Sequence, residues 1–137
     1  MPEVLFLHKG GHAASTRYRA MQYRDCLQQA GWRMQEMQVS GSLSQYRAAL
    51  LAARRADVVV VLKKPFTPLF RYLLRRVSRW LAFDYDDAVY VYDSGDSNPR
   101  RFAQFQAMLS LCDEVWAGNQ ALLQVAGPYT GHSVLLP

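Results

Sequence analysis

The sequence predicts a doubly wound α/β fold, in which a mostly parallel sheet of about six strands carries helices on both faces. Short apolar runs alternate with longer stretches of helical periodicity along all 137 residues, which is typical of repeated β-α units. One run, DVVVVL at 57–62, consists almost entirely of β-branched residues, as a central strand covered on both faces does. Half of the residues are hydrophobic and 20% are charged, which indicates an ordered globular chain.

The first half of the chain predicts two strands and two helices. Residues 3–8 form an apolar run that stops at KGG, and we expect the first strand there. A helical pattern opens at Ser15 and ends at Gly31, because glycine readily takes the left-handed conformation that terminates a helix. Residues 32–39 alternate imperfectly between apolar and polar, so we expect a strand near a sheet edge. A second helix is expected over residues 43–55.

The second half continues the same alternation to the end of the chain. After the central strand at 57–62, the pattern predicts helices at 67–79 and 99–112 and a short helix that begins near Asn119. The remaining strands are expected at 80–85, 114–118 and 132–137. No linker or low-complexity segment interrupts the pattern, so residues 1–137 are predicted to form one domain.

Charge and composition narrow the class of protein. The net charge of +5 is uneven, because no acid occurs between Asp57 and Asp84 while six basic residues do. The amino terminus lacks the basic start of a signal peptide, and no continuous apolar span is long enough to cross a membrane. Cys26 and Cys112 are far apart and have no metal-ligand spacing, so we expect buried free thiols in a reducing cytoplasm.

In a doubly wound fold the ligand crevice lies at the carboxyl ends of the strands, so the loops after strands one, four and five deserve most weight. The first loop contains Gly10 and Gly11, which let a backbone approach a ligand closely, but it lacks GxGxxG and gives no dinucleotide fingerprint. Arg17, Arg19 and the preceding Lys9 put cations near the positive end of a helix dipole. This favours a bound anion such as a phosphate or a sugar acid. The alternative is a pair of solvated arginines that turn away from the helix.

Three carboxylates crowd the end of the fourth strand, in the stretch AFDYDDAV. While the strand persists, Asp84 and Asp86 share one side and Asp87 points elsewhere. Such a group can hold a metal, can separate its pKa values so that one acid acts as a base, or can cap a turn. A phosphate-acceptor role, as in receiver domains, is disfavoured because no acid follows the first strand and no lysine follows the fifth.

The helix expected at 67–79 sets apolar positions against Arg71, Arg75, Arg76 and Arg79. This pattern usually belongs to a core-facing helix with a solvated basic face. It is also compatible with an interfacial helix that binds anionic lipid. Binding to nucleic acid is disfavoured, since the basic residues are not interleaved with aromatic residues that look exposed.

Several segments together resemble the amino-terminal domain of GT-B glycosyltransferases of the family 4 group. They are GHAASTRYRAMQY after the first strand, DVVVVLKK, LAFDYDDAVY, and CDEVWAGNQAL followed by HSVLLP. The resemblance spans nearly the whole chain and rests on order and spacing. It implies a Rossmann-like domain of a retaining transferase that needs neither metal nor cofactor. The implied reaction moves a sugar from a nucleotide-sugar to an acceptor, such as a lipid-linked or polysaccharide-precursor glycan.

The resemblance also implies roles for individual residues. Gly10 and Gly11 would lie against the donor phosphates or the acceptor, and Asn119 would face the same crevice. Asp86 matches a position at which many relatives carry a histidine, so Asp86 and the adjacent Asp87 are the predicted catalytic pair. The role of Asp86 is open among base, ligand of sugar hydroxyls and electrostatic support. The remaining predicted acceptor or phosphate ligands are Lys9, Arg17, Arg19 and Asp84.

Relatives of this type continue into a second domain that holds most of the donor. We therefore expect residues 1–137 to be the acceptor-side half of a larger cytoplasmic enzyme, inactive alone. Peripheral contact with the inner membrane face through the basic helix 67–79 is left open as an alternative to a solvated basic face. Two other functions remain open. One is a noncatalytic α/β module that binds a small anion or a protein partner, and the other is a metal-dependent enzyme that uses Asp84 and Asp86.

Overall fold

A computed structural model of the chain describes residues 2–8, 23–39, 41–62, 66–85 and 98–135. Six strands form one sheet in the order β2-β1-β3-β4-β5-β6, and every neighbouring pair is parallel. The α/β prediction is confirmed, with the 32–39 segment at an edge and the valine-rich strand inside the sheet. The strands are β1 (Glu3–His8), β2 (Arg33–Gln38), β3 (Val58–Leu62), β4 (Leu81–Tyr85), β5 (Glu114–Ala117) and β6 (Ser133–Leu135).

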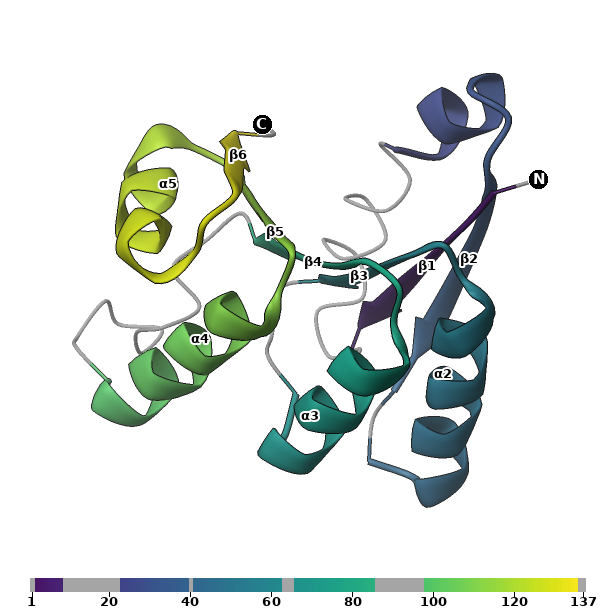
Figure 1. Ribbon diagram of the computed structural model, residues 1–137, viewed down its shortest axis with the longest axis horizontal. Helices are drawn as coiled ribbons and strands as arrows, with labels where there is room; N and C mark the ends of the chain where they lie inside the picture. The colour runs from purple at the N-terminus through teal and green to yellow at the C-terminus, as the bar shows by residue number, and fades with distance from the viewer. Residues whose placement is uncertain (1, 9–22, 40, 63–65, 86–97, 136–137) are drawn as a thin grey trace.

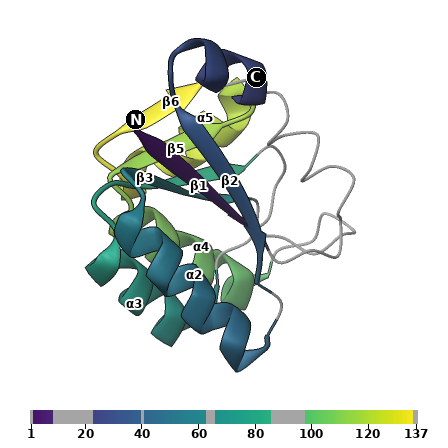
Figure 2. The same ribbon diagram turned by 90° about the vertical axis from the view of Figure 1, so that its right-hand side faces the viewer.

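Helices cover both faces of the sheet, as a doubly wound fold requires. In Figures 1 and 2, α2, α3 and α4 lie side by side in one layer, and the helical residues 23–29 lie on the opposite side of the sheet. The helices are α2 (Leu43–Arg55), α3 (Pro68–Val77), α4 (Pro99–Leu111) and α5 (Gln120–Ala126), and a 3-10 turn (Gly127–Tyr129) follows α5.

Two hydrophobic cores result, one on each face. The larger core joins alternate strand residues, such as Leu5, Val59 and Phe83, to the inner sides of α2, α3, α4 and α5. The smaller core joins the intervening residues, such as Phe6 and Val60, to the helical segment 23–29 and its neighbours. Because successive side chains of a strand point to opposite faces, β3 supplies apolar residues to both cores. The run of valines in β3 is uninterrupted because both faces of this strand are buried.

The helical segment 23–29 ends at Gly31, as the sequence predicted. Gly31 has φ +86. Its N–H donates to the carbonyl of Gln28 at 3.1 Å, and the N–H of Trp32 donates to the carbonyl of Leu27 at 2.8 Å. These two bonds form a Schellman motif, in which a residue in the left-handed conformation satisfies the last helical carbonyls. Trp32 and Leu27 then pack into the smaller core, which leads the chain into β2.

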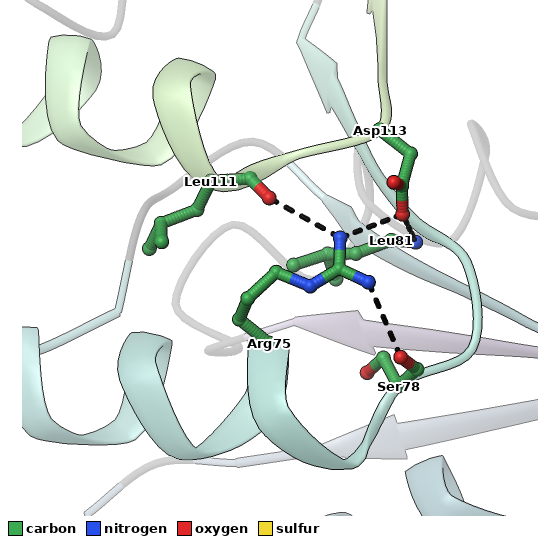
Figure 3. Close-up of polar contacts among 5 residues, drawn as sticks. All are labelled: Arg75, Ser78, Leu81, Leu111 and Asp113. Atoms are coloured by element: carbon green, nitrogen blue, oxygen red, sulfur yellow. Dashed lines mark hydrogen bonds and ion pairs between the residues drawn. The ribbon is translucent and has the colours of Figure 1, made fainter.

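Arg75 ties the carboxyl ends of α3 and α4 to the amino ends of β4 and β5 (Figure 3). Its guanidinium donates to Asp113 Oδ2 at 2.6 Å and to the carbonyls of Leu111 and Ser78 at 3.2 Å each. The same Asp113 oxygen accepts the N–H of Leu81 at 2.8 Å. We call these five residues the Arg75 clip. Partial burial favours a raised pKa for Asp113, but the hydrogen bonds from Arg75 and Leu81 outweigh it and hold the pKa below its usual value.

The prediction of a solvated basic face is therefore wrong for two of the four arginines in residues 67–79. Arg75 belongs to the clip, and Arg71 is buried, with Nη1 donating to the carbonyl of Phe66 at 2.8 Å. Burial lowers the pKa of Arg71, although an arginine stays charged at neutral pH. Arg76 and Arg79 are exposed, as predicted. A guanidinium can cap backbone carbonyls, which is why a basic residue need not face water.

The two cysteines are free, as expected, but only one is shielded from water. Cys26 is exposed, which corrects the prediction that both thiols are buried. Cys112 follows the last residue of α4. Burial raises the pKa of Cys112 to about 12, because a thiolate loses its hydration there.

Candidate functional site

All strands are parallel, so their carboxyl ends lie along one edge of the sheet. The chain passes from β1 outward to β2 and then returns past β1 to β3, so the strand order reverses between β1 and β3. Ligands of such folds bind beside this reversal. The loops beside the reversal therefore follow β1 and β3 directly, whereas the sequence pattern favours the loops after strands one, four and five. The loop after β3 begins at residues 63–65, which lie outside the described part of the chain.

One row of side chains runs across the sheet just before this edge, on the face that residues 23–29 cover. The strand register pairs His8 with Gln38, Leu62 with Asp84, Asp84 with Trp116 and Trp116 with Val134. Leu7 pairs with Val61, so His8 and Leu62 adjoin in the same row. Two buried polar residues, His8 and Asp84, therefore stand on either side of Leu62, two strand spacings or about 10 Å apart.

His8 is the last residue of β1 and is only 7% exposed. Its Nε2 lies 2.9 Å from Glu36 Oε1 on β2, and this contact fixes the orientation of the imidazole ring. His8 is not among the residues predicted from the sequence to form the site. Its position, as a single histidine at the end of an apolar strand and directly before a glycine-containing loop, is the signal that could have identified it.

Asp84 lies within β4, one residue before its end, and is 1% exposed. A buried carboxylate requires polar partners, and Asp84 does interact with other groups of the fold. Asp84 therefore lies inside the fold, and its carboxylate is shielded from solvent.

Asn119 opens α5 at the same edge, as predicted. Its Oδ1 accepts the N–H of Leu122 at 3.0 Å, which makes it the N-cap. The end of β5 is joined to β4 where Gly118 N–H donates to the carbonyl of Tyr85 at 2.9 Å. The Tyr85 hydroxyl donates to the carbonyl of Leu122 at 2.5 Å. These bonds hold the start of α5 against Tyr85, the last residue of β4.

The other predicted site residues lie outside the described part of the chain. They are Lys9, Gly10, Gly11, Arg17, Arg19, Asp86 and Asp87. The structure does define the strand ends from which their loops depart. The glycine-containing loop begins one residue after His8, and the acidic loop begins one residue after Tyr85. Both loops thus leave the same edge, with only β3 between their strands.

Within the described ranges, no group of three or more His, Cys, Asp or Glu residues could together hold a metal ion. Among the helices that these ranges contain, none is long and apolar enough to cross a membrane.

The fold and this edge define the chain as an α/β domain of the Rossmann-like class, with buried polar residues beside the reversal of strand order. No family model matches the chain, and no curated protein matches it in sequence.

Proposed function

We propose that this domain is the acceptor-binding half of a retaining glycosyltransferase of the GT-B type. The enzyme would move a sugar from a nucleotide-sugar to the hydroxyl of a glycan or lipid-linked acceptor in the cytoplasm. A second Rossmann-like domain would supply most of the donor contacts. The cleft between the two domains would lie along the carboxyl edge of the sheet, where an α/β fold offers its ligand site.

One observation carries this proposal. The strand order puts the end of β1 and the end of β4 at the same edge with only β3 between them. The loop with Gly10 and Gly11 and the loop with Asp86 and Asp87 therefore depart from points about 10 Å apart. A sugar together with its phosphate spans such a distance, so a glycine backbone at the phosphate and a carboxylate at the sugar can serve one ligand.

The two buried polar residues also support the proposal. Asp84 comes two residues before Asp86 in the chain, and His8 comes two residues before Gly10. In the proposed division of roles, Asp86 acts at the acceptor hydroxyl or at the sugar hydroxyls. Lys9, Arg17 and Arg19 bind the anionic part of the ligand, because guanidinium and ammonium groups bind phosphate or carboxylate oxygens strongly.

The test uses this domain joined to its donor domain and measures release of nucleotide from a panel of nucleotide-sugars. Asp86→Asn is expected to lower turnover at least about 100-fold, a typical cost of losing an acid-base group, with an unchanged melting temperature. Asp25→Asn is the matched control. Asp25 is an exposed carboxylate in the helical segment 23–29, and its loss should leave turnover unchanged.

Two outcomes would contradict the proposal. Full activity of the Asp86→Asn enzyme would remove the catalytic assignment. Micromolar binding of a nucleotide-sugar to the 137-residue chain alone, measured by calorimetry, would show that this domain holds the donor and is not the acceptor half. A chain that binds a small anion and supports no transfer with any donor would favour a noncatalytic binding module.

A further inference from the structure

The outer face of the α2 and α3 layer displays large apolar side chains to solvent. Of the seven large hydrophobic residues that are exposed in the described ranges, four belong to these two helices: Leu43, Leu51, Leu69 and Tyr72. Leu43 is 85% exposed and Leu69 is 70% exposed, so neither contributes to the core. A helix keeps such residues outside at a cost in solubility, which is why an apolar cluster of this kind usually marks a binding surface.

Arginines occupy the same face. Arg47, Arg54 and Arg55 are exposed on α2, and Arg76 is exposed on α3. Neither helix contains an aspartate or a glutamate. Within the described ranges, no carboxylate forms an ion pair with any of these four arginines. Their positive charge is therefore available to a partner.

The two helices form one continuous surface. They lie side by side in the layer below the sheet (Figure 1), and Tyr46 of α2 packs edge-on against Phe70 of α3 with ring centroids 4.8 Å apart. On α3, the exposed Tyr72 and Arg76 are one turn apart, and the Arg76 guanidinium lies 5.8 Å from the centre of the Tyr72 ring. Apolar and cationic groups are thus interleaved on a single face.

We infer that this face, defined by the exposed residues of α2 and α3, adsorbs to an anionic lipid bilayer. Leucines and an aromatic residue would enter the headgroup region, and the arginines would bind lipid phosphates. This mixture of exposed leucines and arginines argues against two other partners. A surface that binds nucleic acid combines basic residues with stacking aromatic residues and does not need exposed leucines. A second copy of the chain packed face to face would set arginine against arginine without an acid between them.

The inference does not depend on the glycosyltransferase proposal, because vesicle binding needs neither donor nor acceptor. The experiment is cosedimentation of the 137-residue chain with vesicles of equal parts phosphatidylcholine and phosphatidylglycerol, and with vesicles of phosphatidylcholine alone. We expect binding to the anionic vesicles, weaker binding at high salt, and little binding to the neutral ones. Each unit of charge is worth about fivefold in partitioning.

Two double variants separate the charged and apolar contributions. Arg47→Glu with Arg76→Glu should lower partitioning at least about 50-fold. Leu43→Ser with Leu69→Ser should lower it about tenfold, because two partly inserted leucines are lost. The matched control is Arg24→Glu with Arg100→Glu, which makes the same change in net charge at two exposed arginines outside α2 and α3. This control should retain most of the binding, and all variants should keep the circular dichroism spectrum of the original chain.

Several results would overturn the inference. They are failure of the original chain to bind anionic vesicles, equal loss of binding in the control variant, and full binding by the leucine variant. Full binding by the leucine variant would show that charge attraction alone, without insertion of leucines, holds the chain on the vesicles. A dimer that dissociates in the Arg47→Glu, Arg76→Glu variant, together with absence of vesicle binding, would assign the face to a second copy of the chain.

Discussion

Replacing Asp113 with asparagine tests how much the Arg75 clip contributes to the stability of the fold. Asparagine keeps the shape of the side chain and can still accept the N–H of Leu81, but it removes the negative charge that faces Arg75. In the structure, Arg75 Nη1 lies 2.6 Å from Asp113 Oδ2, and the side chains are 26% and 29% exposed. The variant therefore isolates one charged hydrogen bond that is largely withdrawn from water.

The expected loss is about 2 kcal/mol of unfolding free energy, since a hydrogen bond between charged groups contributes about 1.5 to 3 kcal/mol. Arg75→Met should cost somewhat more, because it also removes the hydrogen bonds to the carbonyls of Leu111 and Ser78. The double variant should show a coupling energy of about 1 to 2 kcal/mol, since both single variants break the same contact. Against a typical total of 5 to 15 kcal/mol, each change is easily measured.

The effect should depend on pH with a defined sign. The pKa of Asp113 is lowered in the folded chain, so the folded state favours the ionised form relative to the unfolded state. The stabilisation is therefore present above the unfolded pKa of about 3.9 and is lost as the pH falls through the folded pKa. The stability difference between the original chain and Asp113→Asn should shrink as the pH is lowered from 7 toward 3.

Urea denaturation followed by circular dichroism, at several pH values, provides the measurement. Arg79→Met is the control, because the ion pair of Arg79 with Asp57 at 3.3 Å is exposed and should contribute less than about 1 kcal/mol. If Asp113→Asn is no less stable than this control at pH 7, or if its deficit stays constant to pH 3, then the clip does not act as an ionic contact and the reasoning fails.

Two further predictions follow from the backbone and the thiols. Gly31→Ala should cost about 1 kcal/mol, because alanine disfavours the positive φ of Gly31, whereas Gly127→Ala at φ −47 should be nearly neutral; equal effects in urea denaturation would contradict this. A thiol reagent at neutral pH should modify the exposed Cys26 within minutes and leave Cys112 unmodified until the chain unfolds, because the raised pKa of Cys112 suppresses the reactive thiolate. Rapid labelling of both cysteines in the folded chain would show that Cys112 is accessible.

The elements of the fold were predictable because each has a local signal. The apolar run of β1 stops at a lysine and two glycines, and α2 begins after SGS, so Glu3–His8 and Leu43–Arg55 match the predicted bounds. Gly31 ends its helix by a conformation that the sequence alone suggests. The order of the strands has no such local signal. It depends on the connection from β2 to β3, which crosses over β1. The loop after β3 was therefore not recognised as part of the switch point.

The partners of polar side chains were the least predictable feature. Arg71 and Arg75 share a helix pattern with Arg76, yet neither is fully solvated. Arg71 donates to the carbonyl of Phe66, just before α3, and Arg75 donates to Leu111 and Asp113, which come from other parts of the fold. Periodicity identifies the side of a helix on which a residue lies, but it does not reveal a carbonyl contributed by α4. His8 was missed for a similar reason, since its partner Glu36 belongs to a strand that becomes its neighbour only in the folded sheet.

The two proposals are connected by the direction of the helices. In a β-α unit the helix runs back against its strand, so α2 and α3 begin near the carboxyl ends of β2 and β3. The most exposed leucines, Leu43 and Leu69, lie in the first turns of these helices. They consequently stand near the same edge as His8 and Asn119. A domain adsorbed through this end of the α2 and α3 face would hold that edge close to the headgroups, where the reacting hydroxyl of a lipid-linked acceptor is found. If both proposals hold, the leucines at that end of the two helices favour a lipid-linked acceptor over a soluble one.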